Sequence, residues 1–297
     1  MKINNNKERF EPVSQKEQII IHSIESVEEL EKVRELESRI WSQSDSIPTH
    51  QTLTSVKNGG FVLGAYSHGE LVGFQYSFPG YDGQSIYLCS HILGIDSQFR
   101  SQGIGEKLKH AQREKAAEMG YSYITWTYDP LESANAYLNI AKLGAVGTKY
   151  CVNYYGQLDD SLNGGLPSDR FLVEWRMNQH EVKSQQALGE KEELETALDR
   201  SLIQWEINKD GFPIPKEADH VITSSHDFLY VAIPTDFQGM KEKDMLLAQD
   251  WRMATRNVFT HAFREGWQVI RFLKNTNKNI PVHFYVLIRR GENIHEN

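Results

Sequence analysis

The sequence has little cysteine and no long apolar run. Cys89 and Cys151 are the only cysteines among its 297 residues. They form no Cys-x-x-Cys pair and lie in no His/Cys cluster, so we expect neither a disulfide framework nor a metal site. No apolar stretch approaches the ~20 residues of a membrane-spanning helix, and the polar start MKINNNKERF lacks the apolar core of a signal peptide. The sequence therefore predicts a cytoplasmic protein with no membrane partner.

An excess of positive charge is also absent. The formal net charge is -8 at pH 7, which argues against broad binding to the phosphates of nucleic acid, although a local basic patch could still hold one anionic cofactor. Hydrophobic residues make up 39% of the chain and charged residues 24%, which is the balance of an ordinary globular protein and not of a disordered one. Nucleic acid is therefore not an expected partner, and the sequence leaves the oligomeric state open.

Apolar periodicity predicts alternating strands and helices in the first half of the chain. Ser26, with Glu29 three residues later, resembles a capping box at the start of a helix over residues 26–41. The runs 61–66 and 71–78 flank Ser-His-Gly-Glu, which predicts a hairpin. Further elements are expected as a strand at 19–21, a strand at 86–95, a helix at 104–119, a strand at 123–128, a helix at 132–143 and a strand at 146–155. The predicted fold class is α/β.

The second half of the chain has a similar rhythm. A boundary is expected at 156–167, where GQLDDSLNGGLP is rich in turn formers. Beyond it we expect a strand at 171–175, a charged helical connection at 179–200 kinked at Gly189, strands at 228–233, 269–273 and 282–288, and a helix at 244–264. The segment IPTDF at 233–237 resembles IDSQF at 95–99. This half is therefore either a degenerate repeat or an unrelated α/β segment that also uses Gly as a helix stop.

The stretch HILGIDSQFRSQGIGEKL, residues 91–108, predicts a strand, a short loop and a helix that begins near Arg100-x-x-Gly103-x-Gly105. Glycine lets the backbone approach an anion without a Cβ clash, and the unpaired N–H groups at a helix start attract negative charge. A P-loop would need Gly-Lys-Ser/Thr, and a dinucleotide fingerprint would need Gly where Leu108 stands. The junction therefore indicates a phosphate site of another kind.

This loop, placed after the fourth strand, resembles the pyrophosphate-binding loop of the GNAT superfamily of acyl-CoA-dependent N-acyltransferases, and its context matches that fold over residues 18–155. The resemblance implies a mixed, mostly antiparallel central sheet flanked by helices. It implies a catalytic unit at 18–156. The apolar runs beyond it need burial, so we expect a C-terminal α/β extension at 170–290 that completes the fold and the acceptor cleft. Acetyl-CoA or another acyl-CoA is the implied co-substrate, without a metal. The implied cofactor-binding residues are Leu93, Gly94, Ile95, Arg100, Ser101, Gln102, Gly103, Ile104, Gly105 and Asn135, with Lys107, Lys109 or Arg113 as candidates for the outer phosphate.

The resemblance implies that two strands splay apart beside this loop, and a catalytic base is expected to project into that gap. His91 stands nine residues before Arg100, a spacing similar to that of a catalytic histidine in the arylalkylamine N-acetyltransferases. Imidazole titrates near neutral pH and can remove a proton from an ammonium group. Cys89 has the same side-chain parity, so it is a candidate for binding substrate in the same gap. The alternative is that His91 is a half-buried structural residue.

The general acid is less well defined. Many members of the superfamily carry Tyr on the helix after the fifth strand, but counting back from Gly144 places Ile140 there and Ser133 at the usual Asn. Tyr137 and Asn135 lie one helical turn away and are substitutes if the helix is rotated or shifted. The other candidate donors are Tyr128, Tyr150 and Tyr154.

Hints about the acceptor come from PSDRFLVEW. Arg170, at a strand start, could clamp a substrate carboxylate in a bidentate manner; a salt bridge with Asp169 or Glu174 is the alternative. The segments NAYLNIAKLG, NYYG and SDRFLVEW resemble a bacterial GNAT subgroup associated with amino-acid metabolism, some members of which transfer succinyl groups. The sequence thus predicts transfer of an acetyl or succinyl group from acyl-CoA to the amine of a small molecule such as an amino acid, by direct attack. The alternative is a non-catalytic acyl-CoA-binding regulatory module.

Overall fold

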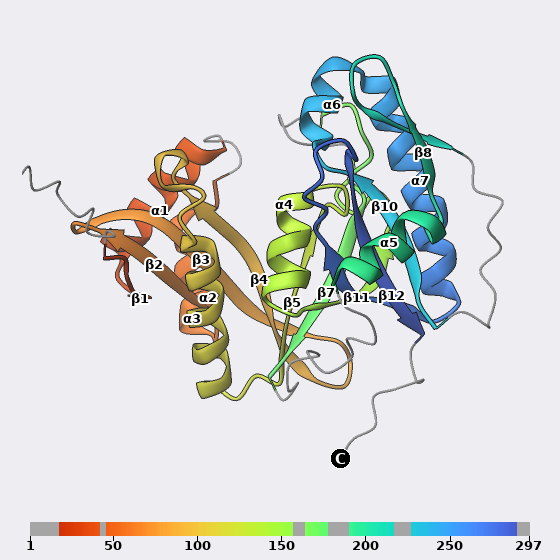
Figure 1. Cartoon of the computed structure of the whole chain (residues 1–297). Coiled ribbons are helices and arrows are strands. Elements are labelled where there is room, and N and C mark those ends of the chain that lie inside the picture. The colour runs from red at the N-terminus through yellow and green to blue at the C-terminus, as the bar shows by residue number, and fades with distance from the viewer. Residues whose placement is uncertain (1–17, 42–45, 157–163, 178–189, 217–226, 290–297) are drawn as a thin grey trace, which may run out of the picture. The chain divides into compact units, whose positions relative to one another are not determined.

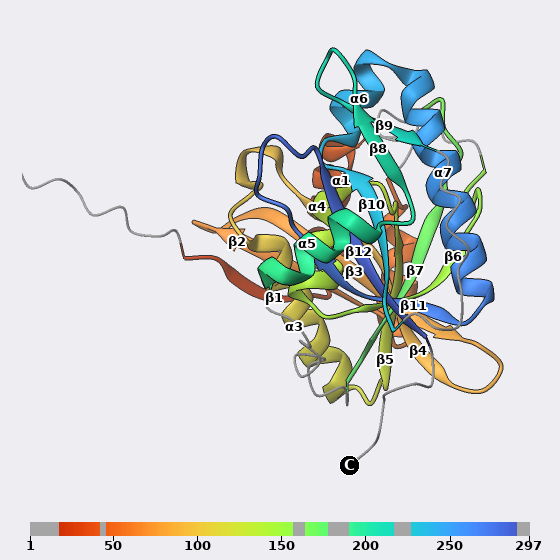
Figure 2. The same ribbon diagram turned by 45° about the vertical axis from the view of Figure 1, so that its right-hand side comes forward.

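The computed structural model describes residues 18–41, 46–156, 164–177, 190–216 and 227–289 (Figures 1 and 2). The chain forms two compact units, the first from residues 1–76 and 92–111 and the second from 77–91 and 112–297. Strands β3 (Glu70–Tyr81) and β4 (Ile86–Ile95) and helix α3 (Ile104–Glu118) each begin in one unit and end in the other. No described helix is long and apolar enough to cross a membrane. A cytoplasmic location stays a prediction.

The first unit begins with a strand and two helices. Its elements are β1 (Ile20–Ile24), α1 (Val27–Ile40), α2 (Thr49–Lys57), β2 (Phe61–Ser67), the first part of β3, the end of β4, the short helix η1 (Ser97–Phe99) and the first part of α3. The Ser26 hydroxyl accepts a hydrogen bond from the Glu29 N–H at 3.2 Å, as the predicted capping box requires. Helix α1 buries Leu30, Val33 and Leu36, so its apolar face packs into the unit's core as the periodicity predicts.

A hairpin joins β2 to β3. His68 and Gly69 lie at its tip with φ of 49° and 82°. Positive φ at both central residues is the signature of the tight turn that matches the twist of two antiparallel strands. Strand β1 pairs antiparallel with β2, with Ile20 opposite Tyr66 and Ile24 opposite Val62. The predicted hairpin is confirmed.

The second unit contains most of the sheet. Its strands lie in the order β4-β5-β7-β6-β11-β12-β10, with bounds β5 (Tyr123–Tyr128), β6 (Val146–Cys151), β7 (Arg170–Arg176), β10 (Leu229–Pro234), β11 (Trp267–Leu273) and β12 (Val282–Arg289). Every pair in this order is antiparallel except β4 with β5, which is parallel. A small separate hairpin consists of β8 (Gln204–Ile207) and β9 (Pro213–Lys216). The predicted α/β fold with a mixed, mostly antiparallel sheet is confirmed, and so is an additional C-terminal α/β region.

Helices cover both faces of the C-terminal strands. They are α4 (Ser133–Ala136), the π-helical segment η2 (Tyr137–Lys142), α5 (Glu190–Arg200), α6 (Phe237–Lys243) and α7 (Met245–Arg264). Arg271 of β11 binds Glu193 of α5, whereas the neighbouring Phe272 and Tyr285 share the face on which Phe259 of α7 packs. Side chains alternate along a strand, so α5 and α7 lie on opposite faces of this part of the sheet (Figure 2).

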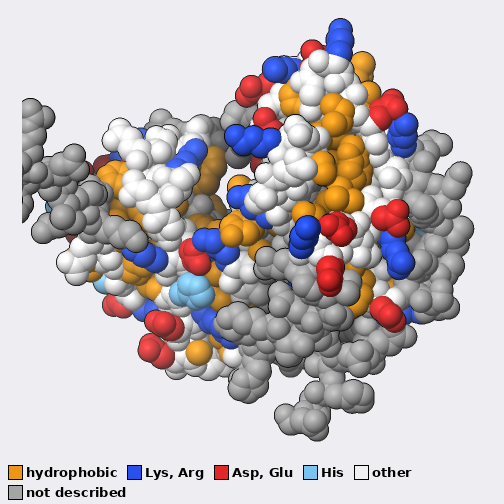
Figure 3. Space-filling view, in the orientation of Figure 1, with side chains coloured by type: hydrophobic (Ala, Val, Ile, Leu, Met, Phe, Trp, Pro, Cys, Tyr) orange, Lys and Arg blue, Asp and Glu red, His pale blue; other side chains and the backbone are white. Residues whose placement is uncertain are grey.

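An aromatic cluster forms the core between α7 and the sheet. The ring centroid of Phe171 lies 4.6 Å from that of Phe259 and 5.2 Å from that of Tyr285. Trp251 of α7 is fully buried and donates a hydrogen bond to the Pro213 carbonyl oxygen at 2.7 Å. Such rings each bury about 150–250 Å², which gives this region a core of its own. Hydrophobic side chains also reach the surface over the region of α6 and β8 in the view of Figure 3.

Several predicted elements differ from the structure. The helix expected at 132–143 divides into α4 and η2, where the Leu143 N–H bonds to the Leu138 oxygen five residues back. The strand expected to reach residue 155 ends at Cys151, because Asn153 has φ of 49° and turns the chain. Helices α2 and α6 and the β8–β9 hairpin were not predicted. Residues 179–189 of the charged connection and 157–163 of the expected boundary lie outside the described residues, and the division into domains at 18–156 and 170–290 stays a prediction.

The two similar segments of the proposed repeat share a cap but not a strand arrangement. Asp96 and Asp236 each follow a strand and each accept a hydrogen bond from a backbone N–H at the start of a short helix. Strands β4 and β5 pair directly, whereas β12 lies between β10 and β11. The capping Asp is the second residue of IDSQF and the fourth of IPTDF, and the repeat stays a prediction.

Candidate functional site

The loop of the first unit that precedes α3 is held by hydrogen bonds to β3 and to the end of β4. The Asp96 N–H donates to the Val72 oxygen at 2.9 Å, and the Asp96 carboxylate accepts from the Gln98 N–H at 3.1 Å. The Arg100 Nε donates to the Ile95 oxygen at 3.4 Å. These bonds fix where the chain leaves the strand and where it approaches the helix.

Two residues of this loop have left-handed backbone conformations. Ser101 has φ of 61° and Gly103 has φ of 77°; the former is uncommon for a residue with a side chain. The Lys107 N–H donates to the Gly103 oxygen at 3.1 Å, so the helical hydrogen bonds begin at Gly103. The first N–H groups of α3 have no acceptor inside the helix, and the positive end of the helix dipole lies with them.

Neighbouring atoms leave room beside the loop glycines Gly103 and Gly105. A Cβ placed on Gly103 would have no atom within 4 Å, and one on Gly105 would meet Leu93 Cδ2 at an ordinary 3.6 Å. Packing within the unit therefore does not require glycine at either position. Gly94 is different, because a Cβ there would lie 2.6 Å from Phe74. The open space beside Gly103, together with backbone donors and a helix start, suits the diphosphate of an acyl-CoA.

The cations near the loop differ in their surroundings. In the first unit, Arg100 and Lys107 are exposed, whereas Lys109 is only 3% exposed. In the second unit, Arg113 donates to the Arg176 and Met177 oxygens and lies 4.9 Å from the centroid of the Trp175 ring. Among the three candidates for an outer phosphate, Lys107 is therefore the exposed one.

Strands β4 and β5 of the second unit are joined over a short distance. The described register contains Leu88 opposite Ile124 and Cys89 opposite Thr125, and no further β4–β5 pair. Strand β5 continues to Tyr128, which pairs with Phe171 of β7. Along β4 the side chains of Leu88 and Ser90 are buried while those of Cys89 and His91 are accessible. Cys89 and His91 thus lie on one accessible face of β4.

His91 combines exposure with partial desolvation. Its ring lies 5.4 Å from that of Phe78, and one part of the side chain reaches solvent. The protein atoms packed around the imidazole lower the pKa of His91 below its usual value. The neutral form, which can accept a proton, therefore dominates at neutral pH.

Two tyrosines considered as the general acid have protein partners. Burial raises the pKa of Tyr128 and of Tyr150. The Tyr128 hydroxyl lies 3.3 Å from that of Tyr285, and the Tyr150 hydroxyl donates to Asp169 at 2.6 Å. Tyr154 is 51% exposed. Tyr128 and Tyr150 are thus committed to the core, and Tyr154 remains accessible.

Tyr137 begins η2 and is partly exposed. The ammonium groups of Lys274 and Lys142 lie 5.0 Å and 5.7 Å from its ring centroid. The position reached by counting back from Gly144, Ile140, is 2% exposed, and the Ser133 hydroxyl donates to the Thr235 oxygen at 2.9 Å. Asn135 is exposed on α4. Tyr137 and Asn135 are therefore accessible to solvent, whereas Ile140 is buried and the Ser133 hydroxyl is bonded within the protein.

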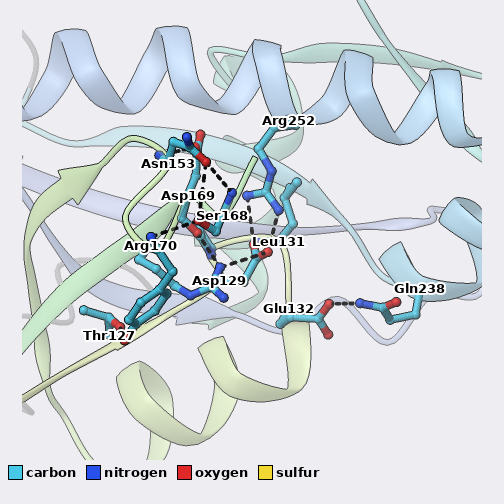
Figure 4. Close-up of polar contacts among 12 residues, drawn as sticks. Thr127, Asp129, Leu131, Glu132, Asn153, Ser168, Asp169, Arg170, Gln238 and Arg252 are labelled. Carbon is cyan, nitrogen blue, oxygen red and sulfur yellow. Dashed lines mark hydrogen bonds and ion pairs between the residues drawn. The ribbon is translucent and has the colours of Figure 1, made fainter. Parts of the chain in front are cut away.

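Arg170 belongs to a cluster of buried charges in the second unit (Figure 4). Its guanidinium lies 3.7 Å from the Asp129 carboxylate and donates to the Asp169 backbone oxygen at 2.9 Å. The carboxylates expected as its alternative partners bind other arginines, Asp169 to Arg256 and Glu174 to Arg176. The role of Arg170 in binding a substrate stays a prediction.

Sequence reasoning did not find the other members of this cluster. Arg252 and Arg256 stand four residues apart on α7, which places both on one helix face. Arg252 donates two hydrogen bonds to the Asp129 carboxylate, at 2.9 Å and 2.5 Å. Arg256 donates two to the Asp169 carboxylate, each at 2.8 Å. Asp129 lies between the guanidinium groups of Arg170 and Arg252 (Figure 4). The four-residue spacing of the two arginines was the available signal, but it does not identify their partners.

Asp169 is fully buried and accepts four hydrogen bonds. They come from Arg256, twice, from the Tyr150 hydroxyl and from the Asn153 N–H. Burial alone would raise the pKa of Asp169, but these hydrogen bonds from Arg256, Tyr150 and Asn153 hold it below the usual value. The carboxylate is therefore ionised and occupied by protein donors. Among the described residues, no group of three or more His, Cys, Asp or Glu side chains could hold a metal ion.

A comparison with protein families agrees with the resemblance that the loop before α3 carries. Residues 29–144 match the model described as the Acetyltransferase (GNAT) family. The match covers less than half of the chain, and over this segment it confirms the resemblance to the GNAT superfamily. The likeness to a subgroup associated with amino-acid metabolism stays a prediction. A comparison with curated proteins gives no match.

Solved structures that resemble the chain include three acetyltransferases. The ribosomal-protein-S18-alanine N-acetyltransferase from Escherichia coli is 14% identical, with 58% of this chain and 99% of that chain covered and a TM-score of 0.45. Aminoglycoside 6'-acetyltransferase type Ii is 20% identical, with 54% and 98% covered and a TM-score of 0.43. The putative acetyltransferase yncA from Salmonella typhimurium, solved with its cofactor acetyl-CoA, is 15% identical, with 55% and 95% covered and a TM-score of 0.44.

Proposed function

We propose that this chain is an acyl-CoA-dependent N-acyltransferase that transfers an acetyl or a succinyl group to the amine of a small molecule such as an amino acid. The observation that carries the proposal is the loop before α3, where Ser101 and Gly103 adopt left-handed conformations beside open space at a helix start. The match of residues 29–144 to an acetyltransferase family supports it.

The loop residues would bind the co-substrate. Backbone groups of Leu93, Gly94 and Ile95 would pair with the pantetheine arm, and the N–H groups from Ser101 to Gly105 would bind the diphosphate, with Arg100 as a charged donor. Asn135 is a further candidate. When bound, an acyl-CoA supplies a thioester carbonyl as the electrophile.

The residues of β4 would act on the acceptor. His91, neutral near pH 7, would take the proton of the acceptor ammonium, and Cys89 on the same strand face would contact the acceptor. The amine nitrogen forms a bond to the thioester carbon, the carbon–sulfur bond breaks, and the thiolate leaves with the bonding electrons. The nitrogen then releases its second proton to water, which leaves a neutral amide. Tyr137 would return a proton to that thiolate. No covalent bond to the protein is needed.

The rival function is a non-catalytic acyl-CoA-binding module. One observation favours it: Ile140 and Ser133 occupy the positions of the superfamily's usual Tyr and Asn, and both are committed to packing within the second unit. We propose further that the C-terminal extension covers the acceptor side and binds no second acyl-CoA, because it has no Arg-x-x-Gly-x-Gly segment.

A thiol-release screen separates these functions. The full chain is incubated with acetyl-CoA or succinyl-CoA and a panel of amino acids, aliphatic and aromatic amines and polyamines. Release that depends on the acceptor supports the transferase, whereas calorimetric binding of coenzyme A without any release supports the binding module. The titration should give one coenzyme A per chain, and a stoichiometry of two would contradict the single-site proposal.

A further inference from the structure

Two exposed tyrosines stand on the turn that follows β6. Tyr154 is 51% exposed and Tyr155 is 50% exposed. Their rings meet edge to face with centroids 4.7 Å apart, so each ring orients the other. Adjacent exposed aromatic rings are a common feature of binding surfaces, because they offer a large contact area at little cost in conformational entropy.

These tyrosines lie beside β5 and β7 of the same unit, and β5 pairs with β4, the strand of His91. The Tyr155 hydroxyl is 3.1 Å from the Thr127 hydroxyl of β5, and the Arg170 guanidinium lies 5.4 Å from the Tyr155 ring centroid. Burial raises the pKa of Tyr154, and the electrostatic influence of Tyr155, Cys151 and Cys89 raises it further. Thr127 stands two residues after Thr125, which pairs with Cys89 of β4, so the turn is linked through β5 to the strand face that carries Cys89 and His91.

The backbone of the turn is held by hydrogen bonds, and about half of each tyrosine side chain stays exposed. The Tyr154 N–H donates to the Ser168 oxygen at 2.9 Å, and the Tyr155 N–H donates to the Ser168 hydroxyl at 3.0 Å. The Ser168 hydroxyl in turn donates to the Gly156 oxygen at 2.7 Å. Asn153, whose φ of 49° is uncommon for a non-glycine residue, donates its N–H to Asp169 at 2.9 Å.

Helix α7 fixes the carboxylate on which this turn depends. Arg256 binds both oxygens of Asp169 at 2.8 Å, and Asp169 is fully buried. A planar guanidinium that binds both oxygens fixes the orientation of a carboxylate, which a single contact does not. Asn153, Ser168 and Asp169 lie together in Figure 4. A helix of the C-terminal half therefore connects, through one carboxylate, to the turn that presents the two tyrosines.

We propose that Tyr154 and Tyr155 bind the amine acceptor of the proposed transferase and that Arg256 is a positioning residue that holds their turn through Asp169. The inference rests on the proposed function and adds to it a task for the C-terminal half: α7 sets the affinity for the acceptor while leaving the affinity for acyl-CoA unchanged. The acceptor meets the rings of Tyr154 and Tyr155 with its apolar part and presents its amine toward β4.

The first test removes the rings. Tyr154→Ala and Tyr155→Ala are assayed by thiol release with acetyl-CoA and each acceptor that the wild type uses from the panel of amino acids, aliphatic and aromatic amines and polyamines. We expect the acceptor KM to rise about tenfold, with kcat within about twofold of wild type and an unchanged calorimetric Kd for coenzyme A. Tyr81→Ala is the control, because Tyr81, the last residue of β3, is another exposed tyrosine (66%) of the same unit.

The second test asks whether Arg256 acts through the tyrosines. Arg256→Gln and Arg256→Lys should both raise the acceptor KM, since lysine keeps the charge but loses the two-point contact. Arg264→Gln, at an exposed position of the same helix, should not. In a double-mutant cycle, Arg256→Gln should add little to the combined Tyr154→Ala and Tyr155→Ala variant, because the turn it positions no longer carries the rings.

The possible outcomes are distinct. Turnover with an unchanged acceptor KM in both tyrosine variants overturns the inference and leaves the proposed function standing. A weaker Kd for coenzyme A with an unchanged acceptor KM reassigns the tyrosines to the co-substrate and also overturns it. Additive effects in the cycle overturn the positioning role of Arg256. If wild type releases no thiol with any acceptor, the proposed function fails and the inference fails with it.

Discussion

The loop of the first unit and the charged cluster of the second unit use their hydrogen-bond donors in opposite ways. In the loop, Gly103 has open space beside it and the first N–H groups of α3 have no acceptor within the helix. In the cluster, Arg252 and Arg256 bind the carboxylates of Asp129 and Asp169 at two points each. The loop is therefore arranged to bind an anion from outside, and the cluster is arranged to hold the chain in place.

This difference shows that arginine content alone does not mark an anion site. Arg170 has the residue type and strand-start position of a carboxylate clamp, yet its guanidinium is 8% exposed and lies beside Asp129. An ion pair of this kind, removed from water, contributes little net stability but is costly to break. Substitutions in the loop and in the cluster can test whether the loop binds an external anion while the cluster stabilises the fold.

The largest effect is expected at the loop. Gly103→Glu should weaken coenzyme A binding at least a hundredfold, about 2.7 kcal/mol, because it adds a side chain and a like charge where the diphosphate would lie. Gly120→Glu is the control, since Gly120 also has positive φ, at 85°, and open space around it. Calorimetry with coenzyme A measures both. An unchanged affinity in a folded Gly103→Glu variant would place the site elsewhere.

The next effect concerns His91. His91→Ala should lower turnover by roughly 10²–10⁴-fold while leaving coenzyme A affinity unchanged. Because desolvation lowers the pKa of His91, its proton-accepting form persists below the usual value of about 6.5. The acid limb of the wild-type kcat/KM profile should therefore have its midpoint below that value, and the limb should disappear in the variant. A wild-type profile retained by His91→Ala would make the residue structural.

In the cluster, Arg252→Ala should destabilise the fold by about 3–5 kcal/mol, since it leaves Asp129, whose side chain is only 12% exposed, without its two-point partner. Arg252 itself is 2% exposed. Urea denaturation measures the change, and Arg264→Ala, at the exposed end of α7, should stay within about 0.5 kcal/mol of wild type. If Arg252→Ala lost no more unfolding free energy than Arg264→Ala, the cluster would tolerate Asp129 without its two-point partner.

The smallest effect is a pH dependence of stability. The folded-state pKa of Asp169 is held below the ordinary value of 3.8, so its contribution is present above that value and is lost as the pH falls through the lowered one. Asp169→Asn removes this titration, and its unfolding free energy should therefore fall less steeply with decreasing pH over this range. Asp210→Asn, at an exposed position, is the control. Equal slopes for wild type and Asp169→Asn would contradict the prediction.

Local signals predicted much of the fold. The strands at 86–95 and 123–128 have the predicted bounds, and the capping box of Ser26 forms. Periodicity and caps depend on neighbouring residues, so they can be read from a short window. Helix α2, THQTLTSVK, was missed because its three threonines give it weak helix propensity. Packing against the rest of the first unit decides its conformation.

The loop before α3 could also be found from sequence, because its glycines and helix start are contiguous. The cluster could not. Arg252 and Asp129 are 123 residues apart, and Arg256 and Asp169 are 87 apart, so no local pattern connects them. The same holds for Tyr155 and Thr127, 28 residues apart on a turn that was expected to be a strand. Long-range ion pairs and turns set by buried carboxylates require the three-dimensional structure.

The crossing of β3, β4 and α3 from one compact unit into the other has a consequence for biosynthesis. The first unit is discontinuous, because residues 77–91 interrupt it and it closes only at residue 111. On a ribosome that delivers the chain from its N-terminus, the first unit can complete its contacts once residue 111 has emerged. In the second unit, β5 can pair with β4 and β7 once residue 176 has emerged, whereas the sheet is complete only when β12, which ends at Arg289, is synthesised. Translation order therefore makes the loop before α3 an early structure and the setting of Tyr154 and Tyr155 a late one.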